Sequence, residues 1–120
     1  MKKLLIVDDQ EMYLMSLAVV LKKTYEIFLS GNYADSIDHL KKGIDITLID
    51  IRLDENDVTN TDGLKILEWI GMNQPATASF IMSAYSEFSY AEQALNLGAK
   101  HFFRKPIDIL SLKAILEEKS

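Results

Sequence analysis

The sequence contains no cysteine among its 120 residues. A disulfide framework and a thiolate metal site are therefore excluded, and nothing ties the protein to an oxidising compartment. Long apolar runs are missing too, because the longest, such as Leu4 to Val7 and Leu17 to Leu21, fall far short of the roughly 20 residues of a membrane span. The four apolar residues after Met1-Lys2-Lys3 do not make a secretory signal. We expect a cytoplasmic protein with no membrane contact.

Positive charge is also scarce, with 13 Lys and Arg against 18 Asp and Glu and a net charge of -5. Nonspecific nucleic-acid binding depends on a positive field, so we expect no direct nucleic-acid binding by this chain. The chain has no linker rich in Pro, Gly or Ser, no internal repeat and no second composition block. With 48% hydrophobic residues it can bury one core. We expect a single domain over residues 1–120, and the sequence leaves open whether it is full-length or a fragment.

Short apolar runs alternate with longer segments of helical period. Strands are predicted at Leu4–Val7, Glu26–Leu29, Ile46–Ile49, Ser79–Met82 and His101–Phe103. Their nearly continuous apolar character is typical of strands buried on both faces of a parallel sheet. Helices are predicted from the apolar spacing within 12–21, 37–44, 64–70, 91–97 and 109–116. Strict alternation predicts an α/β fold, with a parallel sheet between two layers of helices.

Glycines accompany two of the predicted helices. Gly98 follows the fourth helix, where a glycine commonly ends a helix, and Asp62-Gly63 precedes the third.

Polar side chains gather where the predicted strands end. The first strand is followed by Asp8-Asp9, the third by Asp50, the fourth by Ser83 and the fifth by Lys105-Pro106. In an open parallel sheet the binding crevice lies beyond these carboxyl ends. Each residue alone has an ordinary structural role open to it, because Asp caps helices, Ser forms turns and Pro ends strands. Together they favour a functional site, because structural roles such as capping would not by themselves place polar residues at the same end of four strands.

The residue types at this edge predict a metal and phosphate chemistry. Three converging carboxylates repel one another unless a cation neutralises them, so Asp8, Asp9 and Asp50 indicate a hard ion that prefers oxygen. Magnesium is the natural candidate, because it takes one or two carboxylates, keeps several waters and accepts a phosphate oxygen. Lys105 supplies a positive charge to a phosphoryl group, and the Ser83 hydroxyl donates a hydrogen bond to it.

The chain resembles response-regulator receiver domains from about Lys3 to Leu116. Five segments carry the resemblance in order: Leu5-Ile6-Val7-Asp8-Asp9, Leu48-Ile49-Asp50, Met82-Ser83-Ala84-Tyr85, Ala94-Leu95-Asn96-Leu97-Gly98-Ala99 and Phe103-Arg104-Lys105-Pro106. The resemblance implies a flavodoxin-like fold, a three-layer doubly wound (βα)5 sheet with strand order 2-1-3-4-5. It implies that Asp50 is the phosphoacceptor, that Asp8 and Asp9 hold Mg²⁺, and that the backbone carbonyl of Arg52 is a further ligand.

The same resemblance implies a switch. Ser83 is expected to be the switch hydroxyl, Lys105 the phosphate-pairing lysine and Phe102 the switch aromatic, although an ordinary core role for Phe102 stays open. The expected partners are a sensor histidine kinase or phosphotransfer protein, and a second copy bound through the fourth helix, fifth strand and fifth helix. The labile acyl phosphate implies a timed switch that promotes its own dephosphorylation, not a metabolic enzyme.

The chain departs from the family pattern after Asp50, where residues 52–63 are longer than usual and strongly acidic. This loop is expected to overhang the site. It either alters kinase docking, metal affinity or phosphoryl lifetime, or is a tolerated surface insertion. It lacks the glycine and glutamate spacing of an EF-hand. Tyr85 is expected to border the mouth of the pocket.

Three other functions compete with the receiver hypothesis. A haloacid-dehalogenase type phosphatase needs Asp-x-Asp after its first strand, whereas this chain has adjacent Asp8-Asp9. A flavodoxin-like electron carrier is disfavoured because acids would repel the flavin phosphate. A receiver fold that binds partners without phosphorylation remains the main alternative, although Asp50, Ser83 and Lys105 are all retained.

Overall fold

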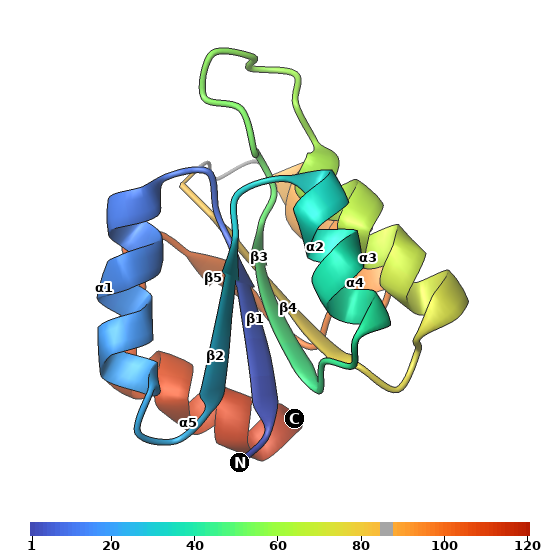
Figure 1. The fold of residues 1–120 in the computed structure, drawn as a ribbon. Coiled ribbons are helices and arrows are strands. Elements are labelled where there is room, and N and C mark those ends of the chain that lie inside the picture. The colour runs from blue at the N-terminus through green and yellow to red at the C-terminus, as the bar shows by residue number, and fades with distance from the viewer. Residues whose placement is uncertain (85–87) are drawn as a thin grey trace.

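The computed structural model describes residues 1–84 and 88–120. Five strands and five helices alternate along the chain (Figure 1). The strands are β1 (Lys3–Val7), β2 (Glu26–Ser30), β3 (Ile46–Asp50), β4 (Ala78–Ser83) and β5 (Phe102–Arg104). The helices are α1 (Glu11–Leu21), α2 (Tyr33–Lys41), α3 (Asp62–Asn73), α4 (Phe88–Asn96) and α5 (Ile109–Lys119). All ten predicted elements are therefore present, with boundaries that differ by a few residues.

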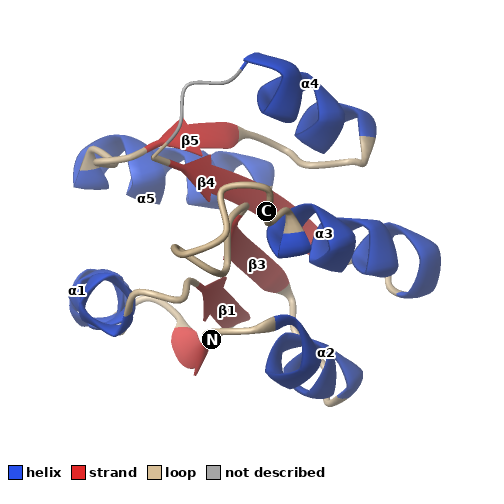
Figure 2. Cartoon of the chain, turned by 90° about the horizontal axis from the view of Figure 1, so that it is seen from above, coloured by secondary structure: helices blue, strands red, loops and turns tan. Residues whose placement is uncertain are grey.

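The strands form one parallel sheet in the order β2-β1-β3-β4-β5. Helices α1 and α5 cover one face and α2, α3 and α4 the other, which gives three layers (Figure 2). The predicted doubly wound α/β fold and its strand order are confirmed. Because β1 lies between β2 and β3, the order of strand addition reverses at β1 and β3, and the carboxyl ends of these two strands border the crevice.

Two hydrophobic cores lie on opposite faces of the sheet. Alternate residues of β1 divide between them, with Leu5 and Val7 facing the α2 and α3 side and Leu4 and Ile6 facing the α1 and α5 side. Each of these four side chains is fully buried. Burial of a Leu or Ile stabilises the fold by about 1.5–3 kcal/mol. The double coverage explains why the central strands are apolar at successive positions.

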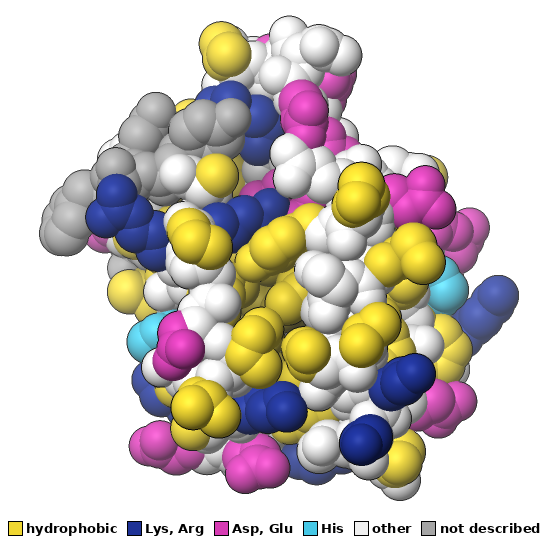
Figure 3. All heavy atoms as spheres, turned by 90° about the vertical axis from the view of Figure 1, so that its left-hand side faces the viewer, with side chains coloured by type: hydrophobic (Ala, Val, Ile, Leu, Met, Phe, Trp, Pro, Cys, Tyr) yellow, Lys and Arg dark blue, Asp and Glu magenta, His cyan; other side chains and the backbone are white. Residues whose placement is uncertain are grey.

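Helix α1 buries only one part of its largely apolar surface. Leu14, Leu17 and Leu21 are its buried residues, whereas Met12, Met15 and Val19 are more than half exposed. The helix is apolar around most of its circumference, so periodicity alone did not identify the buried face. Figure 3 views the side of the molecule that carries α1 and α5, where hydrophobic side chains gather at the surface. Met72, in α3, is exposed as well.

Three residues near helix ends can be compared with their predicted positions. Ile44 lies in the connection after α2 and is buried there, since α2 ends at Lys41. Gly63 lies in the first turn of α3 and not before it. Gly98 follows α4 with a φ of +99°, a conformation that favours glycine at a helix end, as predicted.

Across the described part of the chain, no helix combines the length and the apolar character that crossing a bilayer requires.

Candidate metal centre

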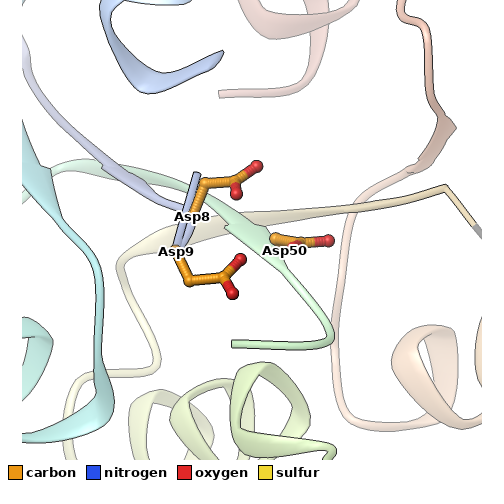
Figure 4. Close-up of side chains that lie close together, drawn as sticks. All are labelled: Asp8, Asp9 and Asp50. Carbon is orange, nitrogen blue, oxygen red and sulfur yellow. The ribbon is translucent and has the colours of Figure 1, made fainter. Parts of the chain in front are cut away.

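Three aspartates meet at the carboxyl ends of β1 and β3. Asp8 and Asp9 follow β1 directly, and Asp50 is the last residue of β3. Because β1 and β3 are adjacent and parallel, the two strand ends bring these side chains to one place. One carboxylate oxygen from each residue lies within 4.8 Å of those of the other two (Figure 4). The predicted convergence is therefore found, and no other such group of metal-binding side chains occurs in the residues described.

The three carboxylates differ in their exposure to water. Asp8 is fully buried, Asp50 is 7% exposed and Asp9 is half-buried. The backbone N–H of Gln10 donates to Asp8 Oδ1 at 2.9 Å. Glu55, from the loop after β3, donates its backbone N–H to Asp9 Oδ2 at 3.1 Å. Backbone N–H groups thus hold two of the three carboxylates in place.

Lys105 brings a positive charge to the cluster from beyond β5. Its Nζ lies 2.5 Å from Asp8 Oδ2 and 3.6 Å from Asp50 Oδ2. The backbone supports this position, since the Lys105 N–H donates to the carbonyl of Ser83 at 2.8 Å. The peptide bond to Pro106 is cis. The sequence placed Lys105 at this edge, and the structure adds its direct pairing with Asp8 and Asp50.

Tyr13 also contacts Lys105, and no pattern in the sequence singled it out. Its ring lies beneath the ammonium, with 4.5 Å between Nζ and the ring centroid. A cation over an aromatic face gains electrostatic stabilisation. Tyr13 is therefore part of the environment that orients the lysine from α1.

The electrostatics of the cluster favour a bound cation. Burial raises the pKa of Asp50 from 3.8 to about 7; Lys105 opposes the rise, and the neighbouring carboxylates add to it. Burial also raises the pKa of Asp9, with a further contribution from Asp8. Burial disfavours the charged form of Lys105, but attraction to Asp50 and Asp8 outweighs it and raises the pKa of the ammonium. With all groups ionised, three carboxylates and one ammonium leave two negative charges, which a divalent cation neutralises.

A small cavity of about 50 Å³ opens beside the cluster. It is lined by Asp9, Gln10, Asp50, Arg52, Glu55, Ala84 and Lys105. A single water needs about 10–15 Å³ of such space, so the cavity admits a cation with some of its waters. Oxygen ligands, excess negative charge and room for water together fit Mg²⁺. A larger hollow of about 600 Å³ between α2 and α3 is lined by none of the predicted site residues.

The remaining predicted residues lie at β4, at β5 and in the loop after β3, and of those that the structure describes only Arg52 lines the cavity. Ser83 ends β4 next to β3 and is buried. Arg52 lines the cavity, and its guanidinium donates to the carbonyl of Val58 at 3.0 Å. Phe102 is half-buried at the start of β5, against the core beneath α3 and α4. Tyr85 lies outside the described residues.

The loop between β3 and α3 leans over the metal centre, as expected from the sequence. It is the segment that projects above the sheet in Figure 1. The Gln10 side-chain amide donates to the Glu55 carboxylate, and both residues line the cavity. The loop was recognisable in the sequence, but Gln10 and Glu55 were not, because nothing in the acidic stretch showed which acid turns inward.

Gly63 allows this loop to return close to β3. Its backbone N–H donates to the carbonyl of Ile51 at 2.9 Å. A Cβ atom at Gly63 would lie 2.0 Å from the carbonyl oxygen of Asp50, a distance that real Cβ atoms essentially never show. Only glycine permits α3 to begin directly against the strand that ends in Asp50.

Comparison with known proteins agrees with this architecture. The chain matches the family model of the response regulator receiver domain over residues 4–117. It is 31% identical over 117 residues to the transcriptional regulatory protein ZraR of Escherichia coli K12, covering 96% of this chain and 25% of that protein. It is 32% identical over 110 residues to sporulation initiation phosphotransferase F of Bacillus subtilis 168, covering 90% of this chain and 85% of that protein. Against ZraR, the chain thus spans a quarter of its relative's length.

A solved structure shows the same fold. The CheY-like receiver domain protein of Methanospirillum hungatei JF-1 superimposes with a TM-score of 0.89 at 24% sequence identity. The alignment covers 99% of this chain and 93% of that one.

Proposed function

Since this chain belongs to the response regulator receiver domains of two-component systems, we propose that Asp50 accepts a phosphoryl group from a histidine kinase or a phosphotransfer protein. The observation that carries the proposal is the cluster of Asp8, Asp9 and Asp50 with Lys105 beside Asp8 and Asp50. Asp8, Asp9, Asp50 and the backbone carbonyl of Arg52 would hold Mg²⁺. The domain would be a cytoplasmic switch of residues 1–120, and not a metabolic enzyme.

The proposed transfer uses the Asp50 carboxylate as nucleophile. Its oxygen forms a bond to phosphorus as the phosphorus–nitrogen bond of the donor phosphohistidine breaks, and the electron pair stays on the imidazole. Catalysis of such transfers is mainly positioning and charge stabilisation. Mg²⁺, when bound, would supply positive charge that offsets the negative charge of the carboxylates and the phosphoryl group. Because the pKa of Asp50 is raised to about 7, a nearby cation favours the ionised form that attacks.

The position of Lys105 beside Asp50 supports a role in binding the phosphoryl group. It lies 3.6 Å from Asp50 and shares Asp8 with the proposed metal site. When a phosphoryl group joins Asp50, the ammonium can exchange a carboxylate oxygen for a phosphoryl oxygen with little movement. This gives Lys105 the role of pairing with the phosphoryl group.

The proposed switch passes from Ser83 to Phe102. Ser83 and Phe102 lie on adjacent strands, β4 and β5. The Ser83 hydroxyl would move toward the phosphoryl group and donate to it, and Phe102, which is half-buried, would move inward. The surface of α4, β5 and α5 would then change shape and bind an effector or a second copy of the domain.

Mass spectrometry of the protein incubated with acetyl phosphate tests the proposal. We expect the gain of one phosphoryl group in the presence of Mg²⁺, none after chelation, and none in Asp50→Asn. The matched control is Asp54→Asn, because Asp54 is exposed on the loop after β3 and its loss should leave the modification intact. No modification of the wild-type protein under any condition would favour the alternative, an interaction module that works without phosphorylation.

A further inference from the structure

The acidic loop, residues 52–61, is attached to the end of β1 by two hydrogen bonds. The backbone N–H of Glu55 donates to Asp9 Oδ2 at 3.1 Å, and the side-chain amide of Gln10 donates to the Glu55 carboxylate. Gln10 in turn donates its own backbone N–H to Asp8 Oδ1 at 2.9 Å. One loop residue is therefore connected, directly or through Gln10, to both aspartates that follow β1.

The acidic loop is internally braced, so the position of Glu55 is built into its structure. The Arg52 guanidinium donates to the carbonyl of Val58 across the loop at 3.0 Å. The Asn60 side chain accepts from the backbone N–H groups of Leu53 and Asp62, both at 3.0 Å. These bonds close the base of the loop and fix the direction in which its tip leaves the sheet. A surface insertion without a role at the site would need no contact with the metal ligands.

Glu55 lines the same cavity of about 50 Å³ as Asp9 and Asp50. Its carboxylate does not belong to the group whose oxygens lie within 4.8 Å of one another. Glu55 therefore lies at the edge of the proposed cation site, outside the three carboxylates that would hold the ion. Magnesium in proteins usually keeps several of its waters, and a carboxylate beside the site can accept hydrogen bonds from them.

We propose that Glu55 is an outer-shell residue of the metal site, which orients Asp9 through its backbone N–H and binds the waters of Mg²⁺ through its carboxylate. The inference rests on the proposed function for the identity of the cation. Groups that orient metal ligands change metal affinity by about 10- to 100-fold in well-enclosed sites. Because Glu55 lies at an exposed edge, we expect a smaller effect, about 3- to 10-fold.

The test measures Mg²⁺ affinity without any phosphoryl donor. Amide chemical shifts are followed by NMR as MgCl₂ is added at pH 7.5 and constant ionic strength. Glu55→Gln keeps the backbone N–H and removes the charge, and it should raise the Kd for Mg²⁺ about 3- to 10-fold. Gln10→Ala keeps the charge but releases the side chain, and it should raise the Kd by a smaller factor.

Asp57→Asn is the matched control. Asp57 belongs to the same loop and carries the same charge, but it is exposed and its carboxylate accepts from Thr59. Its substitution should change the Kd by less than about 2-fold, because exposed charges away from the ion are screened by salt. Urea unfolding of each variant checks that the fold is intact.

Three results would overturn the inference. The first is an unchanged Kd in Glu55→Gln. The second is an equal loss of affinity in Glu55→Gln and Asp57→Asn, which would show that only the total charge of the loop matters. The third is a wild-type protein that binds no Mg²⁺. The outcome is separate from the proposed function, because a protein that binds Mg²⁺ but is not phosphorylated on Asp50 refutes that function and leaves the effect of Glu55 measurable.

Discussion

Gly63→Ala should damage the protein through a single added methyl group. The new Cβ would lie 2.0 Å from the carbonyl oxygen of Asp50, 2.6 Å from Cα of Ile51 and 2.8 Å from the carbonyl carbon of Asp50. All three atoms belong to the backbone at the end of β3, so no side-chain rotation relieves the clash. The start of α3 must move about 1 Å away before the closest contact becomes tolerable.

The expected loss combines three contributions. Overpacking of a rigid site costs about 1–3 kcal/mol. Movement of α3 also weakens the hydrogen bond from Gly63 to Ile51, which contributes about 1 kcal/mol. Alanine offsets up to about 1 kcal/mol through its higher helix propensity. The free energy of unfolding should therefore fall by about 1–3 kcal/mol.

Urea unfolding followed by Trp69 fluorescence measures this loss, because Trp69 is the single tryptophan and lies on α3. With a slope near 2 kcal/mol per molar urea, the midpoint should fall by about 0.5–1.5 M. Gly71→Ala is the control on the same helix, since its Cβ meets only the carbonyl of Leu97 at 3.6 Å. The free energy of unfolding of that variant should rise by up to about 1 kcal/mol. Equal stability changes in the two variants would refute the steric explanation.

Three further predictions concern buried polar groups. In metal-free buffer, the raised pKa of Asp50 makes the folded state bind a proton more tightly than the unfolded state. The free energy of unfolding should therefore fall as pH rises from about 4 to 7. Asp50→Asn should remove this dependence and raise the free energy of unfolding by up to about 4 kcal/mol at pH 8. Lys105→Met should lower the free energy of unfolding by about 3–5 kcal/mol at neutral pH, because it leaves the buried Asp8 carboxylate without its cationic partner. In urea unfolding, added Mg²⁺ should restore part of this loss. Ser79→Ala should lower the free energy of unfolding by about 1–3 kcal/mol, because it leaves the Thr47 hydroxyl without its partner at 3.0 Å. In a double-mutant cycle, adding Thr47→Val should lower it by little more. Additive losses in the two single variants would contradict the pairing.

The parallel sheet was predictable because its strands are buried on both faces. Continuous apolar runs such as Leu4 to Val7 are typical of such strands, and here they alternate with longer segments of helical period. Once the strands are parallel, their carboxyl ends lie at one edge, so Asp8, Asp9 and Asp50 were expected at that edge. Their convergence also required β1 and β3 to be neighbours. The same reasoning placed Ser83 and Lys105 at that edge. The strand order itself came from the family resemblance and not from the apolar pattern.

Several features needed the tertiary structure because they depend on which side chains face one another. The apolar residues of α1 do not by themselves say that Leu14 is buried and Met12 exposed. Nothing local marks Tyr13 as the ring beneath Lys105. In the long acidic loop, every acid looks equivalent until the hydrogen bonds show Glu55 next to Asp9.

The difference between the features that the sequence determined and those that the tertiary structure decided has a simple physical cause. Chain-local information, namely hydrophobic period, strand ends and motif order, determined the layers of the fold and the acids at the crevice. Contacts between segments distant in sequence are set by the packing of the folded chain. The approach of Gly63 to Asp50, the pairing of Lys105 with Asp8 and the attachment of Glu55 to Asp9 were therefore decided only there.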